Sequence, residues 1–462
     1  MWVRPVYHTQ AFIFLRGDFR MRKELPALFC RYALPQAAGL LLNSVYFIVD
    51  GMFIGNRLGR EAMAAAGVAV PMLEFMIALS MAIASGCGVL VSLALARHRD
   101  EEARECAMHA LIAAVAAGLL LSVLGNLLIR PLAFFLGSTE AILGDVVTYL
   151  SIILSLSPFM ILSFLLGGLV RNDGHPVHAM TALAVGSLAN IALDWLFMYP
   201  LGLGIAGAAW ATALGPLLSC LMLLPHFLSR RGALFFVPVR PRLPLFGRML
   251  GLGVPAFVME FSIGMITAIT NLAIGRLHLG EMGLAAYLLI GYLMLIILTL
   301  FLGMAEGLQP VFSQMKGKGD LEGLQGMRTF SQIVFVLIGG ITCVLAFFFS
   351  RHFYSLFTAG DQSLLDFTSA HSRAYFSGFV FAGINILLIS FWQATEETGK
   401  SMLTALLRSA LIPPCTVLLL PLLFGPDLFW FGHSAAEAVT CLAAVLLLFR
   451  SGSIGENKKG EA

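Results

Sequence analysis

The sequence predicts an all-α polytopic membrane protein with twelve transmembrane helices, arranged as two parallel six-helix repeats. Three observations lead to this fold class. The 462 residues are 59% hydrophobic and only 12% charged, whereas a soluble domain carries roughly 25% charge. The apolar runs are about 20 residues long, as helices that span a bilayer require, and do not alternate as β-barrel strands do. Finally, the two halves of the chain share a pattern.

The apolar segments follow one another along the whole chain, and each is long enough to span a bilayer. They lie at residues 32–56, 62–95, 107–130, 142–169, 177–199, 206–228, 249–275, 283–312, 328–350, 368–392, 402–424 and 430–449. Several exceed the minimum length, so we expect these helices to tilt or to extend beyond the membrane.

The basic residues indicate which side of the membrane each connection occupies. The chain has 29 Lys and Arg residues. With the N-terminus inside, Arg408 falls within a span, and the outer side holds only Arg57, Arg60, Arg130, Arg276, Arg351 and Arg373. All the others fall on the inner side, so the positive-inside rule predicts that both termini are cytoplasmic.

The two halves resemble each other at an offset of about 220 positions. Pro35 corresponds to Pro255, and the sequence Gly55–Gly59 corresponds to Gly275–Gly280. Six helices per half return the chain to the same face, so the repeats are parallel and the substrate path is expected between them. The predicted divisions are a cytoplasmic segment at 1–30, an N-lobe at 31–228, a cytoplasmic linker at 229–248, a C-lobe at 249–450 and a cytoplasmic tail at 451–462.

Asp50 and Asp194 are the strongest candidates for functional residues, because each is an acid inside an apolar span. A carboxylate in the bilayer centre costs at least ~2.5 kcal/mol, and such residues usually mark an ion or substrate path. From the rise of about 1.5 Å per residue, both acids and Thr212 lie at similar depth, and Asn190 is one turn from Asp194. These oxygens suit Na⁺, or paired acids that share a proton. The alternative is that they only hydrogen-bond between helices.

Other intramembrane acids are candidates for lining a substrate cavity. Glu260 and Glu306 lie in the first two spans of the second half, Glu74 in the second span and Glu437 in the last. Any of them can attract a cationic substrate, or can instead be a structural partner of a neighbouring polar group.

The remaining composition excludes several classes of function. The net charge is +3 and no basic patch with interleaved aromatics suggests nucleic acid. The seven cysteines form no CxxC pair, the histidines lack HExxH spacing, and no GxxxxGK[ST] loop is present, so we expect no cofactor and no enzyme activity. His175, His178 and His371 are near helix ends and are interpreted as interfacial side chains. Met21 is an alternative start.

Several motifs together resemble the multidrug and toxic-compound extrusion (MATE) family. The first span contains Pro35 and Asp50, followed by Phe53-Ile54-Gly55 and Leu58-Gly59. The other motifs are Arg171-Asn172-Asp173-Gly174-His175-Pro176, Asn190-Ile191-Ala192-Leu193-Asp194, Gly207-Ala208-Ala209-Trp210-Ala211-Thr212 and Gly307-Leu308-Gln309-Pro310. The resemblance covers nearly the whole chain and is closest to the bacterial DinF-like branch.

This resemblance implies V-shaped lobes and alternating access that exports organic cations, drugs or toxic compounds in exchange for H⁺ or Na⁺. It also implies that Asp50, Asn190, Asp194 and Thr212 form the cation-coupling site, and would be the metal ligands if Na⁺ is the coupling ion. We expect Gln309 to line the substrate cavity with the acids above, and helices to bend at Pro35 and Pro255. Glu260 and Glu306 depart from the family pattern.

A lipid or lipid-linked oligosaccharide flippase of the same superfamily is the alternative function. Flippases of that kind often carry an arginine-rich cavity, whereas the candidate cavity residues here are mostly acids. We expect a monomer in the lipid bilayer of a bacterial inner membrane, with a cationic, amphipathic small molecule as substrate.

Overall fold

The computed structural model describes residues 24–58, 60–229, 232–277, 279–355 and 361–457. These residues are almost entirely helical, and the structure confirms the all-α fold class. The predicted N-terminal segment and the alternative start at Met21 fall largely or wholly outside the described residues, as does the end of the predicted tail.

The first half of the chain forms eight helices, two of which are short. They are α1 (Leu25–Leu58), α2 (Arg60–Ala96), α3 (Asp100–Leu127), α4 (Ile129–Phe135), α5 (Leu143–Ser155), α6 (Ser157–Asn172), α7 (Pro176–Met198) and α8 (Gly204–Leu228). The linker to the second half is shorter than predicted, because α9 begins at Leu243 and thus includes the last part of the predicted 229–248 connection.

The second half repeats this pattern, except that its fifth span is interrupted by a π-helical turn. Its elements are α9 (Leu243–Arg276), α10 (Gly280–Lys318), α11 (Leu321–Ser355), α12 (Gln362–Phe376), α13 (Phe379–Ala394), α14 (Thr398–Leu406), the π-helical turn η1 (Leu407–Leu411), α15 (Ile412–Phe424), the 3₁₀ turn η2 (Pro426–Phe431) and α16 (Gly432–Asn457).

Bent helix pairs occur at matching places in the two halves. The α5–α6 pair and the α12–α13 pair are each bent by 46°, and each is the fourth span of its half. By length and composition, ten helices in the described part of the chain can cross a membrane, or up to twelve if each bent pair is one span. The upper figure agrees with the twelve segments found in the sequence.

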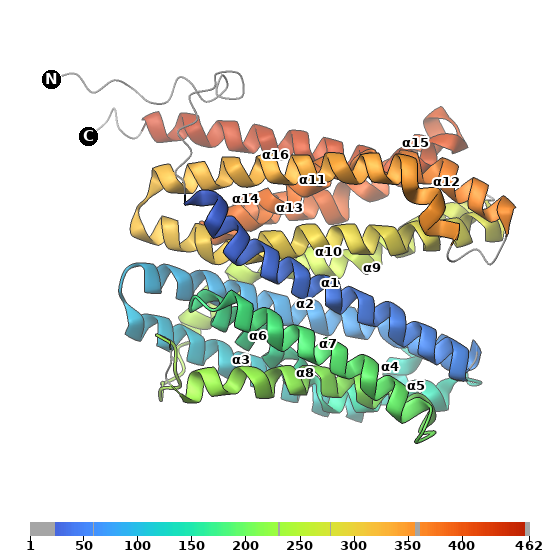
Figure 1. Cartoon of the computed structure of the whole chain (residues 1–462), viewed down its shortest axis with the longest axis horizontal. Coiled ribbons are helices and arrows are strands. Elements are labelled where there is room, and N and C mark those ends of the chain that lie inside the picture. The colour runs from blue at the N-terminus through green and yellow to red at the C-terminus, as the bar shows by residue number, and fades with distance from the viewer. Residues whose placement is uncertain (1–23, 59, 230–231, 278, 356–360, 458–462) are drawn as a thin grey trace.

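Figure 1 shows the helices running along a common axis in two groups, with α1–α8 on one side and α10, α11, α13 and α16 on the other. We call these groups the N-lobe (α1–α8) and the C-lobe (α9–α16). Large hydrophobic side chains remain exposed along the outward faces, for example Leu120 and Val123 on α3 and Leu337 and Ile341 on α11. Exposed apolar surface of this extent is typical of a face that contacts lipid.

Glycines allow the two lobes to approach closely through α1 against α10 and α2 against α9. A Cβ added to Gly307 of α10 would lie 2.4 Å from the carbonyl oxygen of Tyr32, and one added to Gly86 of α2 would lie 2.0 Å from that of Met249. Both contacts are toward the end of the bundle where α1 begins, which we call the basic end because Arg97, Lys316 and most of the other basic residues that the structure describes lie there.

The two prolines expected to bend helices lie inside continuous helices. Pro35 is within α1 and Pro255 within α9, and neither helix is interrupted at its proline. Proline has no amide hydrogen, so the carbonyls of Arg31 and Gly251 lack their usual helical donors. Each helix is therefore weakened at this point, and bending during function remains a prediction.

Candidate functional site

The structure brings Asp50, Asn190, Asp194 and Thr212 together inside the N-lobe, and we call this group the N-lobe pocket. Asp50 comes from α1, Asn190 and Asp194 from α7, and Thr212 from α8. The carboxyl groups of Asp50 and Asp194 lie close enough to interact directly. Asp50 is 7% exposed and Asp194 is fully buried, so neither points at lipid.

Two glycines explain how α7 and α8 hold this arrangement. A Cβ on Gly186 of α7 would lie 2.8 Å from the carbonyl oxygen of Gly215 on α8, and one on Gly215 would lie 2.9 Å from that of Gly186. The two backbones are therefore in contact. The same contact places the Asn190 side chain beside Gly215, at 3.5 Å from its added Cβ. Small residues commonly permit such close packing of membrane helices.

Most polar side-chain atoms of the N-lobe pocket have no hydrogen-bond partner among the described residues. This holds for Asp50 Oδ1, both Asp194 carboxyl oxygens, the Asn190 side-chain oxygen and nitrogen, and Thr212 Oγ1. Buried polar groups are nearly always paired, and unpaired ones call for an explanation such as an ion. Carboxylate, amide and hydroxyl oxygens are hard ligands of the kind that alkali and alkaline-earth cations prefer. The donor set therefore fits a small cation or a proton shared by the two acids.

Two tyrosines lie near this pocket that were not identified as site residues from the sequence. Tyr46 of α1 is buried and lies within electrostatic range of Asp50, Asp194 and Glu74. Tyr149 of α5 is also buried and lies beside Thr212, near both aspartates. Tyr46 is one turn before Asp50, so helical spacing offered a signal for it. Nothing in the sequence links Tyr149 to the pocket, because α5 is placed there only by tertiary packing.

A larger cavity lies between the two lobes, where about 920 Å³ is not filled by protein atoms, open solvent included. We call it the central cavity. Residues of α1, α2, α6, α7 and α8 line it from the N-lobe, and residues of α9, α10 and α13 line it from the C-lobe. Its polar side chains include Gln36, Arg171, Glu260, Glu306 and Gln309. Glu260, Glu306 and Gln309 thus line this cavity, and their role in binding substrate stays a prediction.

Glu74 does not belong to the lining of the central cavity. It lies on α2 about 10 Å along the helix axis from Met81, the nearest lining residue of that helix. Glu74 is half-buried and lies within electrostatic range of both Tyr46 and Glu260. It therefore occupies the region between the N-lobe pocket and the C-lobe, and the expectation that it lines the cavity is corrected.

Hydrogen bonds across the central cavity connect the lobes. Gln36 Nε2 of α1 donates to Glu306 Oε2 of α10 at 2.9 Å, and Arg171 Nη1 of α6 lies 4.0 Å from the same oxygen. Gln309 Nε2 donates to Ser85 Oγ at 2.6 Å. By contrast, Glu260 accepts no hydrogen bond from any residue that the structure describes. Among the described residues, Glu260 thus lacks the direct polar contacts that Glu306 has, and Arg408 acts on it only electrostatically.

A second hollow leads from the central cavity toward the N-lobe pocket. It is lined by Tyr46, Asn190 and Thr212, among others. The two hollows share the lining residues Ser163, Phe164, Leu183 and Ser219. The hollow inside the N-lobe and the space between the lobes are therefore adjacent and share part of their wall.

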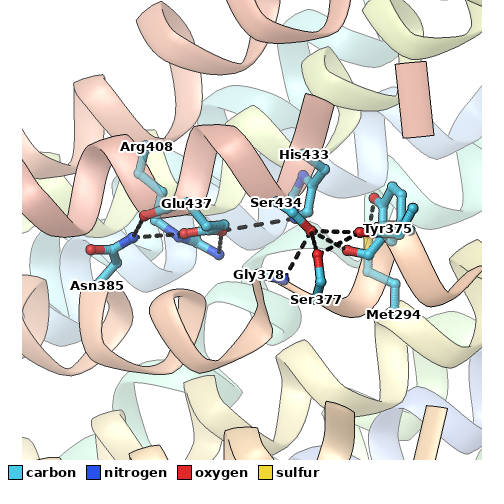
Figure 2. A network of polar contacts seen from close by, with 10 residues as sticks. Met294, Tyr375, Ser377, Gly378, Asn385, Arg408, His433, Ser434 and Glu437 are labelled. Carbon is cyan, nitrogen blue, oxygen red and sulfur yellow. Dashed lines mark hydrogen bonds and ion pairs between the residues drawn. The ribbon is translucent and has the colours of Figure 1, made fainter. Parts of the chain in front are cut away.

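Glu437, which the sequence left open as a cavity residue, is instead part of a buried network in the C-lobe. Arg408 Nη2 lies 2.8 Å from Glu437 Oε1, and Asn385 Nδ2 donates to Glu437 Oε2 at 2.8 Å. Figure 2 shows Arg408 and Asn385 beside Glu437, with His433 and Ser434 nearer the start of α16. Arg408 lies in the π-helical turn η1. Of the two interpretations that the sequence left open for Glu437, these contacts support that of a structural partner.

Comparison with known proteins places the chain in a family. Residues 35–196 and 255–418 both match the MatE family, one match in each half. The multidrug export protein MepA of Staphylococcus aureus (strain N315) is 24% identical over 425 residues, covering 90% of this chain and 92% of that protein. MepA of Staphylococcus saprophyticus is 22% identical over 422 residues with the same coverage.

Solved structures share the fold. A crystal structure of a MATE protein in complex with MaL6 has a TM-score of 0.89 at 21% identity, covering 95% of this chain and 98% of that one. An outward-facing multidrug resistance MATE family transporter of the MOP superfamily has a TM-score of 0.88 at 20% identity, covering 95% and 100%. The repeat, the two lobes and both family matches agree, and the chain belongs to the MatE family of membrane transporters.

Proposed function

We propose that this protein is a secondary active antiporter that exports organic cations or other toxic compounds in exchange for H⁺ or Na⁺. The observation that carries this proposal is the N-lobe pocket, where two adjacent buried carboxyl groups have three oxygens without a hydrogen-bond partner among the described residues, beside a hollow that adjoins the central cavity. The energy comes from an ion gradient, since the sequence has no nucleotide-binding loop.

The coupling ion binds in the N-lobe pocket. Two carboxylates this close resist ionising together, so one proton or one Na⁺ relieves their repulsion. Asp50 and Asn190 come from different helices, so loading the pocket draws α1 and α7 together and unloading releases them. Because α1 also carries Gln36, which bonds Glu306 across the cavity, a movement of α1 around Pro35 changes the substrate site.

The substrate binds in the central cavity and is a cation with an apolar body. Glu306 is partly compensated by Arg171, whereas Glu260 forms no ion pair or hydrogen bond with a described residue, and Arg408, which acts on it electrostatically, is already paired with Glu437. Leu40, Met81, Phe164 and Met259 supply adaptable apolar wall, and methionine is suited to varied ligands. This charge balance does not favour a lipid-linked pyrophosphate, which requires several cationic groups.

Alternating access follows from the packing of the lobes. The glycine contacts of α1 with α10 and of α2 with α9 close the central cavity toward the basic end. We place this end in the cytoplasm of a bacterial cell, with both termini inside, because positive charge favours that side. Separation of these helices opens the cavity to the cytoplasm, and the protein works as a monomer in the plasma membrane.

Transport in proteoliposomes tests this proposal. Purified protein is reconstituted, and uptake of a lipophilic cationic dye is followed while a pH gradient or a Na⁺ gradient is imposed separately. We expect dye to accumulate against its gradient under one of these conditions and not in their absence. Equal dye movement with and without either gradient would contradict antiport.

A further inference from the structure

A second polar cluster lies at the basic end of the N-lobe, outside the N-lobe pocket and the central cavity. It consists of Asp173 and His175, in the connection between α6 and α7, and His226, in the last turn of α8. We propose that these three residues form a binding site for a divalent transition metal of the Zn²⁺ type, which we call the loop metal site.

The geometry places three ligand atoms close together. His226 Nε2 lies 2.8 Å from Asp173 Oδ2, and the His175 and His226 rings have their centroids 4.9 Å apart. One ligand atom from each residue lies within 4.8 Å of the other two. Ligand bonds of about 2.0–2.1 Å to tetrahedral Zn²⁺ place ligand atoms roughly 3.3 Å apart. Metal binding therefore requires His226 Nε2 and Asp173 Oδ2 to give up their hydrogen bond and move apart by about 0.5 Å, and the exposed His175 ring to rotate toward them.

Further hydrogen bonds made by His175 and Asp173 orient their side chains for metal binding. His175 Nδ1 lies 2.9 Å from the Asp173 carbonyl oxygen, so the Nδ1–H tautomer leaves Nε2 free as a ligand. Asp173 Oδ1 accepts the backbone N–H of Ala233 at 3.0 Å, which fixes the carboxylate. Such outer contacts orient ligands in metal sites and help to select their protonation state.

The donor set determines the class of metal. Two imidazoles and one carboxylate suit Zn²⁺, Co²⁺, Ni²⁺ or Cu²⁺ and do not suit Mg²⁺ or Ca²⁺, which prefer oxygen ligands. Three protein ligands leave a fourth position for water. The side chains of His226 and Asp173 are 2% and 4% exposed, whereas His175 is exposed, so the metal enters from the His175 side.

A bound metal would brace the connection between the lobes. Asp173 holds the linker residues Ala233 and Leu234 through their N–H groups, and a Cβ on Gly232 would lie 1.7 Å from Asp173 Oδ2. The preceding residue, Asn172, accepts a hydrogen bond from Gln314 of α10 at its carbonyl oxygen. Metal binding at Asp173 thus fixes a loop that contacts the linker on one side and the C-lobe on the other.

Titration of the whole purified chain tests the loop metal site. The protein, in detergent and with a tag that lacks histidine, is treated with chelator and titrated with Co²⁺, whose visible absorption reports the coordination, and then with Zn²⁺ as competitor. We expect one Co²⁺ per chain, displaced by Zn²⁺ and not by excess Mg²⁺, and a rise in the thermal unfolding temperature with Zn²⁺.

Two single variants make the test specific. His175→Ala removes an exposed ligand without disturbing the buried pair, and should weaken Co²⁺ binding at least tenfold. His178→Ala is the matched control, because His178 is also close to His226 but its Nε2 contacts the Met222 carbonyl oxygen. We expect it to bind as the wild type does. The proposal is overturned by the absence of saturable binding, by unchanged binding in His175→Ala, or by equal losses in both variants.

Discussion

Asp50 of α1 and Asp194 of α7 lie side by side in the interior of the N-lobe, and neither aspartate has a basic partner there. The polar groups around them are Asn190, Thr212, Tyr46 and Tyr149, none of which carries a positive charge. A pair of buried acids in this setting is costly unless a cation joins it. The pair is therefore the centre of the proposed coupling between ion and substrate.

The carboxyl group of Glu260 is predicted to set the charge preference of the central cavity. Glu260→Gln keeps the shape and removes the charge, so a monovalent cationic dye should bind about tenfold more weakly, equivalent to about 1.4 kcal/mol. Binding of an uncharged analogue should change little. The measurement is fluorescence titration of purified protein in detergent.

Glu140→Gln is the control for this experiment, because Glu140 is exposed in the connection between α4 and α5. It should bind both dyes as the wild type does. If Glu260→Gln lowers the affinity for the charged and uncharged dyes equally, the effect is steric and the charge argument is wrong.

The close contact of α10 with α1 predicts opposite effects of the same substitution at two glycines. Gly307→Ala places a Cβ 2.4 Å from the Tyr32 carbonyl oxygen, and such overpacking typically costs about 1–3 kcal/mol. Gly291 is on the same helix with nothing within 4 Å of an added Cβ. Gly291→Ala should therefore leave stability unchanged or raise it by about 0.5–1 kcal/mol, as replacement of glycine within a helix does.

Thermal unfolding of the two glycine variants in detergent measures this difference. We expect a lower unfolding temperature for Gly307→Ala and an equal or higher one for Gly291→Ala. An unfolding temperature for Gly307→Ala at or above that of the wild type would show that the lobes do not meet through this contact.

The buried pair of Arg408 and Glu437 is predicted to stabilise the C-lobe only as a pair. The side chains are 12% and 3% exposed, and removing one partner from a buried ion pair typically costs about 3–5 kcal/mol. Arg408→Met should thus destabilise the protein strongly. Replacing both residues, as Arg408→Met with Glu437→Leu, should recover much of the loss because no charge is left unpaired.

A double-mutant cycle on unfolding free energies checks this coupling. If the loss of unfolding free energy in the double variant equals the sum of the two single losses, the side chains are not energetically coupled. That result would contradict the network in Figure 2.

The spans and part of the site could be predicted from the sequence because both depend on regular properties of single helices. Hydropathy reflects transfer into the bilayer, so each span is visible locally, and the constant rise of a helix placed Asp50, Asp194 and Thr212 at one depth. Contacts that depend on rotation and packing were not accessible. Tyr149 reaches the pocket only through the placement of α5, and Glu437 could not be assigned to Arg408 until the positions of α16 and η1 were known.

The residues of the proposed loop metal site also could not be grouped from the sequence. Asp173 and His226 are 53 positions apart, with two helices between them, and no short motif joins them. From the sequence, His175 is interpreted as an interfacial side chain because it lies near a helix end. Only the antiparallel return of α8 beside the α6–α7 connection brings the three residues together.

Gradient-driven dye accumulation in proteoliposomes by the wild type, Asp50→Asn and Asp194→Asn, with Glu140→Gln as control, tests the central claim most directly. Asparagine keeps the size of the side chain and removes the acid. We predict that both aspartate variants fold, bind dye in detergent and lose accumulation against the gradient, while the control accumulates dye as the wild type does. Full accumulation by either aspartate variant at equal protein content would contradict the account.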